Sequence, residues 1–440
     1  MPTTPRSYAR RSMRERAMRR VAGLLRARLP ELALEEVPDP RAREGRWALP
    51  QILRATLVGL LTGCKSLADA EALTEGLAPA MRRRLGLPRR LADTTARDAL
   101  CRVPLGGLRS ALHRLVRAAW RRRALRPVGL PVSVLALDGK ATSLPALNHP
   151  LVQNHIEGQV VPYGLVRTVT CSLVSAAGRP CIDAIPTPAG TNEVAWFQTA
   201  FGSVVETYGR LFDVVTYDAG GFSRANADAV IAAGKDYLFA LKDEHRTMCK
   251  LALELLAMET VVAHTEDALD GGTTVVRSLK LLRADPSWSY GDGKTPEESV
   301  WPHAKAFLAV EYVKVQRGVI VERDERTFVS SYDPTRLTAA QWLRLVRSHW
   351  GVESSHHTLD TAFAEDDRPW IEADPQGMLA VLLLRRIAYT LLALYRAVTL
   401  RSDEGRATRW KALLQAVRDV LVAATEGQLA GLREVAAAAR

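Results

Sequence analysis

Residues 132–139 read Val-Ser-Val-Leu-Ala-Leu-Asp-Gly, a compact apolar run that ends in an acid and a glycine. A short apolar run closed by a turn signal is typical of a strand buried on both faces. Residues 211–218 read Leu-Phe-Asp-Val-Val-Thr-Tyr-Asp and repeat the pattern, with small residues following. We therefore predict two buried strands, Val132–Leu137 and Leu211–Tyr217, each with an aspartate at its carboxyl end.

The segments that follow these runs predict an α/β fold with a mixed sheet flanked by helices. Three more strands and two helices are expected at residues 165–175, 179–185, 236–242, 192–208 and 223–233, respectively. Strands that can pair antiparallel, followed by alternating helices and strands, are typical of a sheet with helices on its faces. Residues 244–331 then read mainly as strands, which predicts a β-rich insertion.

Helices are predicted on either side of this α/β segment. The pattern over residues 49–123 is helical with basic faces, which resembles a helix-turn-helix reader in outline; a bundle with solvated charged faces fits the same pattern. After the insertion, Thr338 is expected to cap a long helix over residues 339–363, and another helix follows at 379–395. The arginines that we expect to contact DNA in the first part are Arg82, Arg83, Arg84, Arg89, Arg90 and Arg97.

Charge is unevenly distributed along the 440 residues. Residues 1–130 hold 28 basic and 11 acidic side chains, whereas residues 131–440 hold 32 basic and 37 acidic ones. A basic first third on a mildly acidic remainder indicates a polyanionic partner. We favour nucleic acid over a membrane, because the basic segments lack a Trp- and Phe-rich apolar face. No apolar run approaches the roughly 20 residues of a spanning helix.

Composition and cysteine usage narrow the class of protein. The 47% hydrophobic and 25% charged residues are typical of a globular protein and exclude disorder, collagen repeats and a disulfide scaffold. The five cysteines form no C-x-x-C pair and indicate thiols in a reducing cytoplasm. The Arg-rich residues 1–28 can be read as an organelle transit peptide, but we favour a basic arm on DNA phosphates.

Three acids are the candidates for chemistry. Asp138 and Asp218 each end a predicted buried strand, where ligands gather in open sheets. Singly, either one also fits an aspartate that only makes a turn. Glu353 lies on the predicted long helix, near His349 and His356 on one face. If that face packs on the sheet, the three carboxylates form an all-oxygen site suited to Mg²⁺ or Mn²⁺.

Other interpretations of this helix remain open. One is a zinc site built from His349, Glu353, His356 and His357, although their spacing matches no standard zinc signature. Another is a polar stripe on a partly exposed helix. A neighbouring acid can also be the ligand in place of Glu353, the candidates being Asp360, Glu365, Asp366 and Asp367.

Three blocks of sequence are specific in combination, namely Leu137-Asp138-Gly139-Lys140, Thr216-Tyr217-Asp218-Ala219 and His349-Trp350-Gly351-Val352-Glu353. Together they resemble the DDE transposases of bacterial insertion sequences, in the branch that includes the H-repeat-associated proteins. Residues 39–46, 235–242 and 385–388 also resemble segments of that family, and the similarity covers about residues 35–400.

The resemblance implies an RNase H-like α/β core that is interrupted by a β-rich insertion. The expected division is a basic arm (1–38), a helical DNA-binding domain (39–128), the first part of the core (129–243), the insertion (244–331), the second part of the core with the glutamate helix (332–400) and a helical tail (401–440).

The resemblance also implies that Asp138, Asp218 and Glu353 are the catalytic residues and the ligands of two Mg²⁺ or Mn²⁺ ions. The activity is then metal-dependent strand cleavage and strand transfer at insertion-sequence ends. Expected partners are transposon-end DNA, target DNA and a second copy of the chain in a synaptic homodimer, with no membrane. The expected location is the bacterial cytoplasm, and the nucleoid when DNA is bound. His349 and Asp360 stand where a related group carries Arg and Lys.

Four residues near the glutamate are further candidates for DNA contact, namely Arg347, Trp350, Arg385 and Arg386. The indole can stack on an extruded base, although a core tryptophan fits as well. The arginines can meet phosphates, or be solvated or ion-paired. Two rival functions remain: an RNase H-like nuclease or resolvase that cuts without joining, and a domesticated, non-catalytic DNA-binding protein. The presence of all three acids counts against the second.

Overall fold

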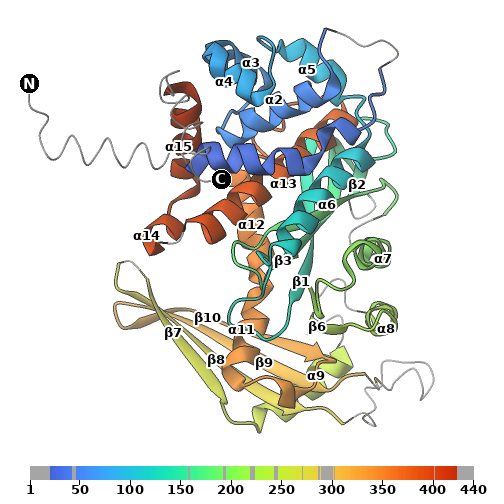
Figure 1. The fold of residues 1–440 in the computed structure, drawn as a ribbon. Helices are drawn as coiled ribbons and strands as arrows, with labels where there is room; N and C mark the ends of the chain where they lie inside the picture. The colour runs from blue at the N-terminus through green and yellow to red at the C-terminus, as the bar shows by residue number, and fades with distance from the viewer. Residues whose placement is uncertain are drawn as a thin grey trace, which may run out of the picture.

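The computed structural model describes residues 20–41, 46–156, 159–191, 195–218, 223–241, 246–269, 271–285, 288, 301, 303–400 and 402–423. A ten-stranded mixed sheet runs through the protein in the order β2-β3-β1-β5-β6-β10-β9-β8-β7, with β4 paired to β3 (Figure 1). Its strands are β1 (Val134–Pro145), β2 (Gln153–Ile156), β3 (Gln159–Leu173), β4 (Cys181–Thr187), β5 (Val214–Tyr217), β6 (Asp236–Leu241), β7 (Ala263–Leu269), β8 (Thr273–Arg283), β9 (Ala306–Gln316) and β10 (Val319–Ser330).

Helices cover this sheet and form most of the N-terminal part. In Figure 1 the first helices lie at the end of the molecule opposite the β7–β10 region, and α11 and α12 run between the two. The helices are α2 (Leu49–Leu61), α3 (Leu67–Gly76), α4 (Pro79–Leu85), α5 (Asp93–Leu100), α6 (Leu105–Arg121), α7 (Phe197–Tyr208), α8 (Arg224–Ala232), α9 (Arg246–Ala257), α11 (Ala339–Ser348), α12 (Trp350–Thr361), α13 (Pro375–Leu394), α14 (Asp403–Arg406) and α15 (Trp410–Ala423).

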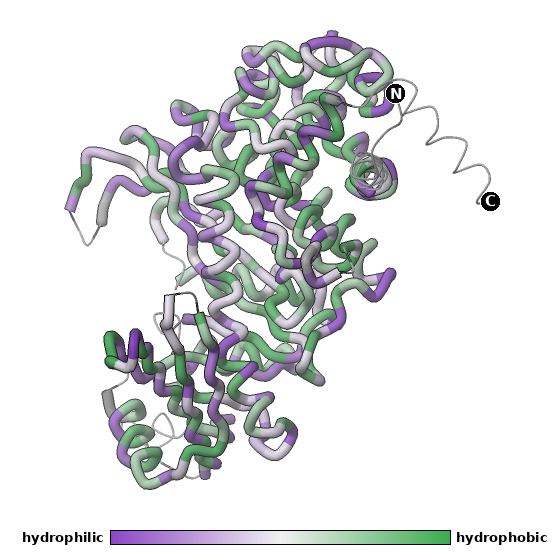
Figure 2. The backbone as a smooth tube through the Cα atoms, turned by 90° about the vertical axis from the view of Figure 1, so that its left-hand side faces the viewer, coloured by the Kyte–Doolittle hydropathy of each residue, from purple (hydrophilic) through white to green (hydrophobic). Residues whose placement is uncertain are grey.

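The predicted α/β fold is confirmed, with a mixed sheet flanked by helices. Strands β1, β5 and β6 are parallel, and β3 and β10 join them antiparallel. Since successive side chains of a strand point to opposite faces, the sheet separates two cores. Leu135 and Val215 belong to the core on the α13 side, whereas Val134 and Val214 belong to the core on the α11–α12 side. Figure 2 shows hydrophobic and hydrophilic segments interspersed along the tube.

Helix α13 is the centre of the larger core. It packs against α2, α5, α6 and β4, and so ties the N-terminal helices to the sheet. Together with the π-helical turn that follows, it forms a run, Pro375–Thr399, that is long and apolar enough to cross a membrane. That apolar window is buried within the protein throughout, as in the core helix of a folded domain.

The predicted β-rich insertion is present and extends the core sheet. Residues Thr327–Ser330 of β10 pair with 238–241 of β6, so one ladder of hydrogen bonds runs from the core into β9, β8 and β7. Strand β7 was not among the predicted strands. The division of the chain into six parts stays a prediction, and residues 1–19 of the predicted arm lie outside the described residues.

Two predicted elements differ from the structure. The first strand does not end at Leu137: β1 continues to Pro145, because β3 supplies an antiparallel partner along its whole length. The predicted helix over residues 339–363 is observed as α11 and α12, with His349 between them. Thr338 caps α11 as predicted, since its hydroxyl accepts a hydrogen bond from the backbone N–H of Gln341.

Candidate active site

Asp138 and Asp218 stand at matching positions of two neighbouring parallel strands. The last paired residues of β1 and β5 are Ala136 and Thr216, and each aspartate lies two residues beyond its strand's pair. Residues two apart share a face of the sheet, so both carboxylates lie on the face covered by α11 and α12. Strand β5 ends at Tyr217, while β1 continues past Asp138 along β3 alone. The end of the parallel pairing therefore leaves an edge where both acids are presented.

Glu353 reaches the same region from α12, which packs on β1 and β3. Desolvation raises the pKa of its carboxyl, although the residue is exposed by area, and the negative charge of Asp138 raises that pKa further. Asp218 adds to the same upward shift, while the positive charge of Arg326 opposes it. The charges of both aspartates therefore act on the pKa of Glu353, so the other two predicted acids lie within electrostatic range of the glutamate.

Two histidines contact residues of this site. The Nδ1 atom of His356 lies 3.2 Å from an Oδ2 of Asp138, and this histidine is only 9% exposed. The Nδ1 atom of His349 lies 3.0 Å from the hydroxyl oxygen of Thr216, one turn of α12 before the glutamate. Burial lowers the pKa of His349 against the opposing charge of Asp138, which favours a neutral ring. His349 is therefore fixed by a hydrogen bond to Thr216, and His356 lies in polar contact with Asp138.

The donor set is of the kind that suits a divalent cation. Three carboxylates that repel one another are the oxygen ligands that Mg²⁺ and Mn²⁺ prefer. Among the described residues no three His, Cys, Asp or Glu side chains lie close enough together to hold one ion. Mg²⁺ keeps several waters and binds through one or two carboxylates plus substrate phosphates. A site in which no three side chains hold one ion is therefore compatible with Mg²⁺. A zinc site built from His349, Glu353, His356 and His357 is not formed.

The neighbouring acids are engaged elsewhere. Lys140 donates to Asp360 at 2.8 Å and to Asp366 at 2.7 Å, which ties the end of α12 and the turn after it to β1. Glu365 is buried, and its Oε2 accepts a hydrogen bond from Arg386 at 2.5 Å. Lys140 belongs to one of the blocks quoted above but was not singled out. The signal in the sequence that could have identified Lys140 is its position two residues after a candidate site aspartate.

The prediction that Arg385 and Arg386 contact DNA is wrong in this structure, because both side chains are buried. Their exposed fractions are 1% and 0%. Arg386 is neutralised by Glu365, while Arg385 donates to the backbone oxygens of Glu365 and Arg368. Both therefore brace α13 against the segment that follows α12.

The helices that carry the N-terminal arginines, α4 and α5, lie at the end of the molecule away from α11 in Figure 1. Arg82, Arg83 and Arg84 belong to α4, Arg89 and Arg90 follow it, and Arg97 is on α5. All but the half-buried Arg82 are exposed, with Arg90 paired to Glu71 and Arg89 bonded to the backbone oxygen of Arg46. Their contact with DNA stays a prediction.

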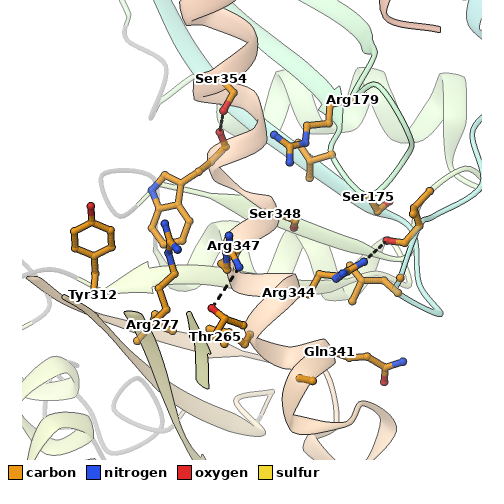
Figure 3. Close-up of a pocket in the computed structure, with 18 of the residues that line it drawn as sticks. Ser175, Arg179, Thr265, Arg277, Tyr312, Gln341, Arg344, Arg347, Ser348 and Ser354 are labelled. Atoms are coloured by element: carbon orange, nitrogen blue, oxygen red, sulfur yellow. Dashed lines mark hydrogen bonds between the residues drawn. The ribbon is translucent and has the colours of Figure 1, made fainter. Parts of the chain in front are cut away.

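Arg347 and Trp350 line a cavity of about 1030 Å³ bounded by α11, the start of α12 and strands of the insertion (Figure 3). Arg347 pairs with Asp267 at 3.1 Å, and Trp350 is half-buried, with its ring edge-to-face with Phe328. Other arginines of this cavity were missed from the sequence, because they come from segments far apart in the chain; they are Arg179, Arg277, Arg326 and Arg344.

Comparison with known proteins identifies the family. The Transposase DDE domain family matches residues 167–391, about half of the chain, which includes Asp218 and Glu353 and begins after Asp138. No curated protein matches the chain by sequence. Among solved structures, the fold is similar to a chain of the cryo-EM structure of a piggyBac transposase synaptic complex with hairpin DNA, with a TM-score of 0.39 and 10% identity over 95% of this chain and 79% of that one. The chain belongs to the transposase DDE domain family.

Proposed function

We infer that this transposase cleaves and joins DNA strands at the ends of an insertion sequence, with Asp138, Asp218 and Glu353 as its catalytic residues. Family membership makes the chain a DDE-type transposase, an enzyme that cleaves and transfers DNA. The observation that carries the finer proposal is the matched position of the two aspartates at the end of the parallel β1–β5 pairing, with Glu353 responding to both.

The residues of this site have different roles. Asp138, Asp218 and Glu353 would hold two Mg²⁺ or Mn²⁺ ions, each through a pair of carboxylates. When bound, divalent ions activate the attacking oxygen and stabilise the leaving oxygen of an in-line displacement at phosphorus. His356 holds one carboxylate of the site in place. The Lys140 pairs hold α12 against β1, and thereby keep the glutamate near the aspartates.

The expected partners follow from the activity. Transposon-end and target DNA are the substrates, and the exposed arginines of α4 and α5 are proposed to hold the ends through their phosphates. Two ends must be brought together, so we propose that the chain works as a homodimer. The proposed location is the bacterial cytoplasm, on the nucleoid when DNA is bound.

The test is a strand-transfer assay with labelled element ends, target DNA and Mg²⁺. Wild-type protein is expected to cut and join, and Asp138→Asn, Asp218→Asn and Glu353→Gln are each expected to abolish both steps while DNA binding remains. Cutting without joining would support the nuclease or resolvase alternative instead. Binding with no metal-dependent cutting would support the domesticated protein, and full cleavage by Glu353→Gln would remove that residue from the triad.

A further inference from the structure

The cavity lined by Arg347 and Trp350 is walled by segments that are distant in sequence. The turn between β3 and β4 forms one wall, α11 and the start of α12 form another, and β8, β9 and β10 of the insertion close it. Figure 3 shows Arg179, Arg277, Arg344 and Arg347 reaching into this space from three of those segments. We call this space the arginine groove.

The charge of the arginine groove is positive. Five arginines line it, against two carboxylates, those of Glu322 and Asp324. Arg179 and Arg344 are both exposed, and neither has an ion-pair partner among the residues that the structure describes. The guanidinium of Arg344 donates a hydrogen bond to the backbone oxygen of Val128, at 3.3 Å. Uncompensated guanidinium groups in a concave site attract polyanions.

The aromatic rings of the groove are already covered. The guanidinium of Arg326 lies 5.3 Å from the ring centre of Trp350, and that of Arg277 lies 5.2 Å from the ring centre of Tyr312. An arginine on one face of a ring competes with an extruded base for that face. The groove is therefore suited to the sugar-phosphate backbone, which arginines bind through its oxygens.

The groove reaches the helix that carries Glu353. Trp350 and Ser354 line it from α12, on either side of Glu353 in sequence. Arg326 also lines it, and its charge acts on the pKa of Glu353. A strand lying in the groove would thus lead to the acids along the first turn of α12.

We propose that the arginine groove binds the phosphodiester backbone of a DNA strand on its way to the three acids, through Arg179 and Arg344, without reading base sequence. This rests on the proposed function and assigns its substrate a path that the basic N-terminal helices do not supply. The two arginines reach the groove from the β3–β4 turn and from α11, so a strand held by both bridges the first and second parts of the core, alongside the insertion strands that close the groove.

The test measures binding of a labelled duplex of arbitrary sequence, with EDTA present, over a range of salt concentrations. Arg179→Gln and Arg344→Gln are each expected to weaken binding several-fold and to reduce the slope of log K against log salt by about one, and the double variant by about two. The control is Arg323→Gln. That exposed arginine pairs with Glu311 on the other face of β10, so its loss leaves the slope unchanged. A duplex of scrambled sequence should show the same losses.

The outcomes separate this proposal from the proposed function. If wild-type protein binds and Glu353-dependent cleavage occurs, but the two variants keep the wild-type slope, the groove proposal is wrong and the function stands. A loss seen with only one of the two duplex sequences would also overturn it, because backbone contacts carry no sequence information. If wild-type protein neither binds nor cuts DNA, both proposals fail.

Discussion

The Nδ1 atom of His356 lies 3.2 Å from Oδ2 of Asp138, and the other ring nitrogen is buried with no hydrogen-bond partner among the described residues. The one polar contact described for this histidine is therefore with a carboxylate of the candidate active site. Groups that orient a ligand typically contribute 10- to 100-fold to metal affinity or activity.

We predict that His356→Ala raises the Mg²⁺ concentration needed for half-maximal cleavage by roughly 10- to 100-fold, while Asp138→Asn abolishes cleavage at every Mg²⁺ concentration. His356→Gln, which keeps an N–H donor, should recover part of the loss. Metal titrations of the cleavage rate check this. A Mg²⁺ dependence identical to wild type in His356→Ala would show that the contact has no part in positioning Asp138.

Lys140 links three segments, and its removal should loosen α12. Its ammonium contacts Asp360 at 2.8 Å and Asp366 at 2.7 Å, so Lys140→Met would leave two carboxylates facing one another without a cation. We expect a loss of about 1–3 kcal/mol in the free energy of unfolding, measured by urea denaturation. Lys140→Arg should restore most of it.

A matched control for Lys140 is Lys314→Met. Lys314 lies on the insertion and pairs with Glu322 at 3.7 Å, with both side chains well exposed. Such surface pairs contribute about 0–1 kcal/mol. Equal losses from Lys140→Met and Lys314→Met would contradict the role of Lys140 as a tether.

Arg386 and Glu365 form an ion pair with exposed side-chain fractions of 0% and 1%. Removing one partner leaves an uncompensated buried charge, so Arg386→Met and Glu365→Gln are each expected to cost about 3–5 kcal/mol of unfolding free energy. The double variant Arg386→Met/Glu365→Leu should be less destabilised than either single one. Thermal unfolding checks this, and a variant that unfolds normally but binds DNA poorly would return Arg386 to the list of DNA contacts.

Asp183 predicts a pH dependence of stability. Burial alone would raise the pKa of this carboxyl, but hydrogen bonds from Arg109 and His113 outweigh it and hold the pKa below its usual value. Because the folded pKa is the lower one, the stabilisation is complete above the unfolded value of about 3.9 and is lost as the pH falls through the folded value.

We therefore expect Asp183→Asn to lower the free energy of unfolding by about 3–5 kcal/mol at pH 7, since it removes the buried anion that pairs with the half-buried Arg109. The difference from wild type should persist at pH 5 and shrink only below about pH 4. Denaturation curves at several pH values measure it. A difference that vanished between pH 5 and 7 would contradict the assignment of this stabilisation to Asp183.

Local signals in the sequence predicted many element boundaries. Ser66, Ser223 and Thr338 each cap a helix through their own hydroxyls, as expected of residues that satisfy free backbone N–H groups. The apolar run before Asp218 ends where β5 ends, at Tyr217. The continuation of β1 beyond Asp138 was missed, because the half-polar residues after it become a strand only when β3 supplies partners.

Burial of charge was the feature that local pattern could not predict. Arg385 and Arg386 read as solvent-facing charges, yet their partners lie about twenty residues earlier, and only the fold brings them together. The arginine groove has the same origin, since Arg179 and Arg344 are 165 positions apart in the sequence and share a cavity.

The sequence by itself determined the parts: which segments become strands and helices, and the two aspartates that follow buried runs. These depend on side-chain periodicity and on short-range hydrogen bonds, which neighbouring residues carry. The tertiary structure alone decided which charges are paired, which are buried and which line the groove. Whether two charged side chains pair depends on the distance between them in space, and strand register and helix packing set that distance.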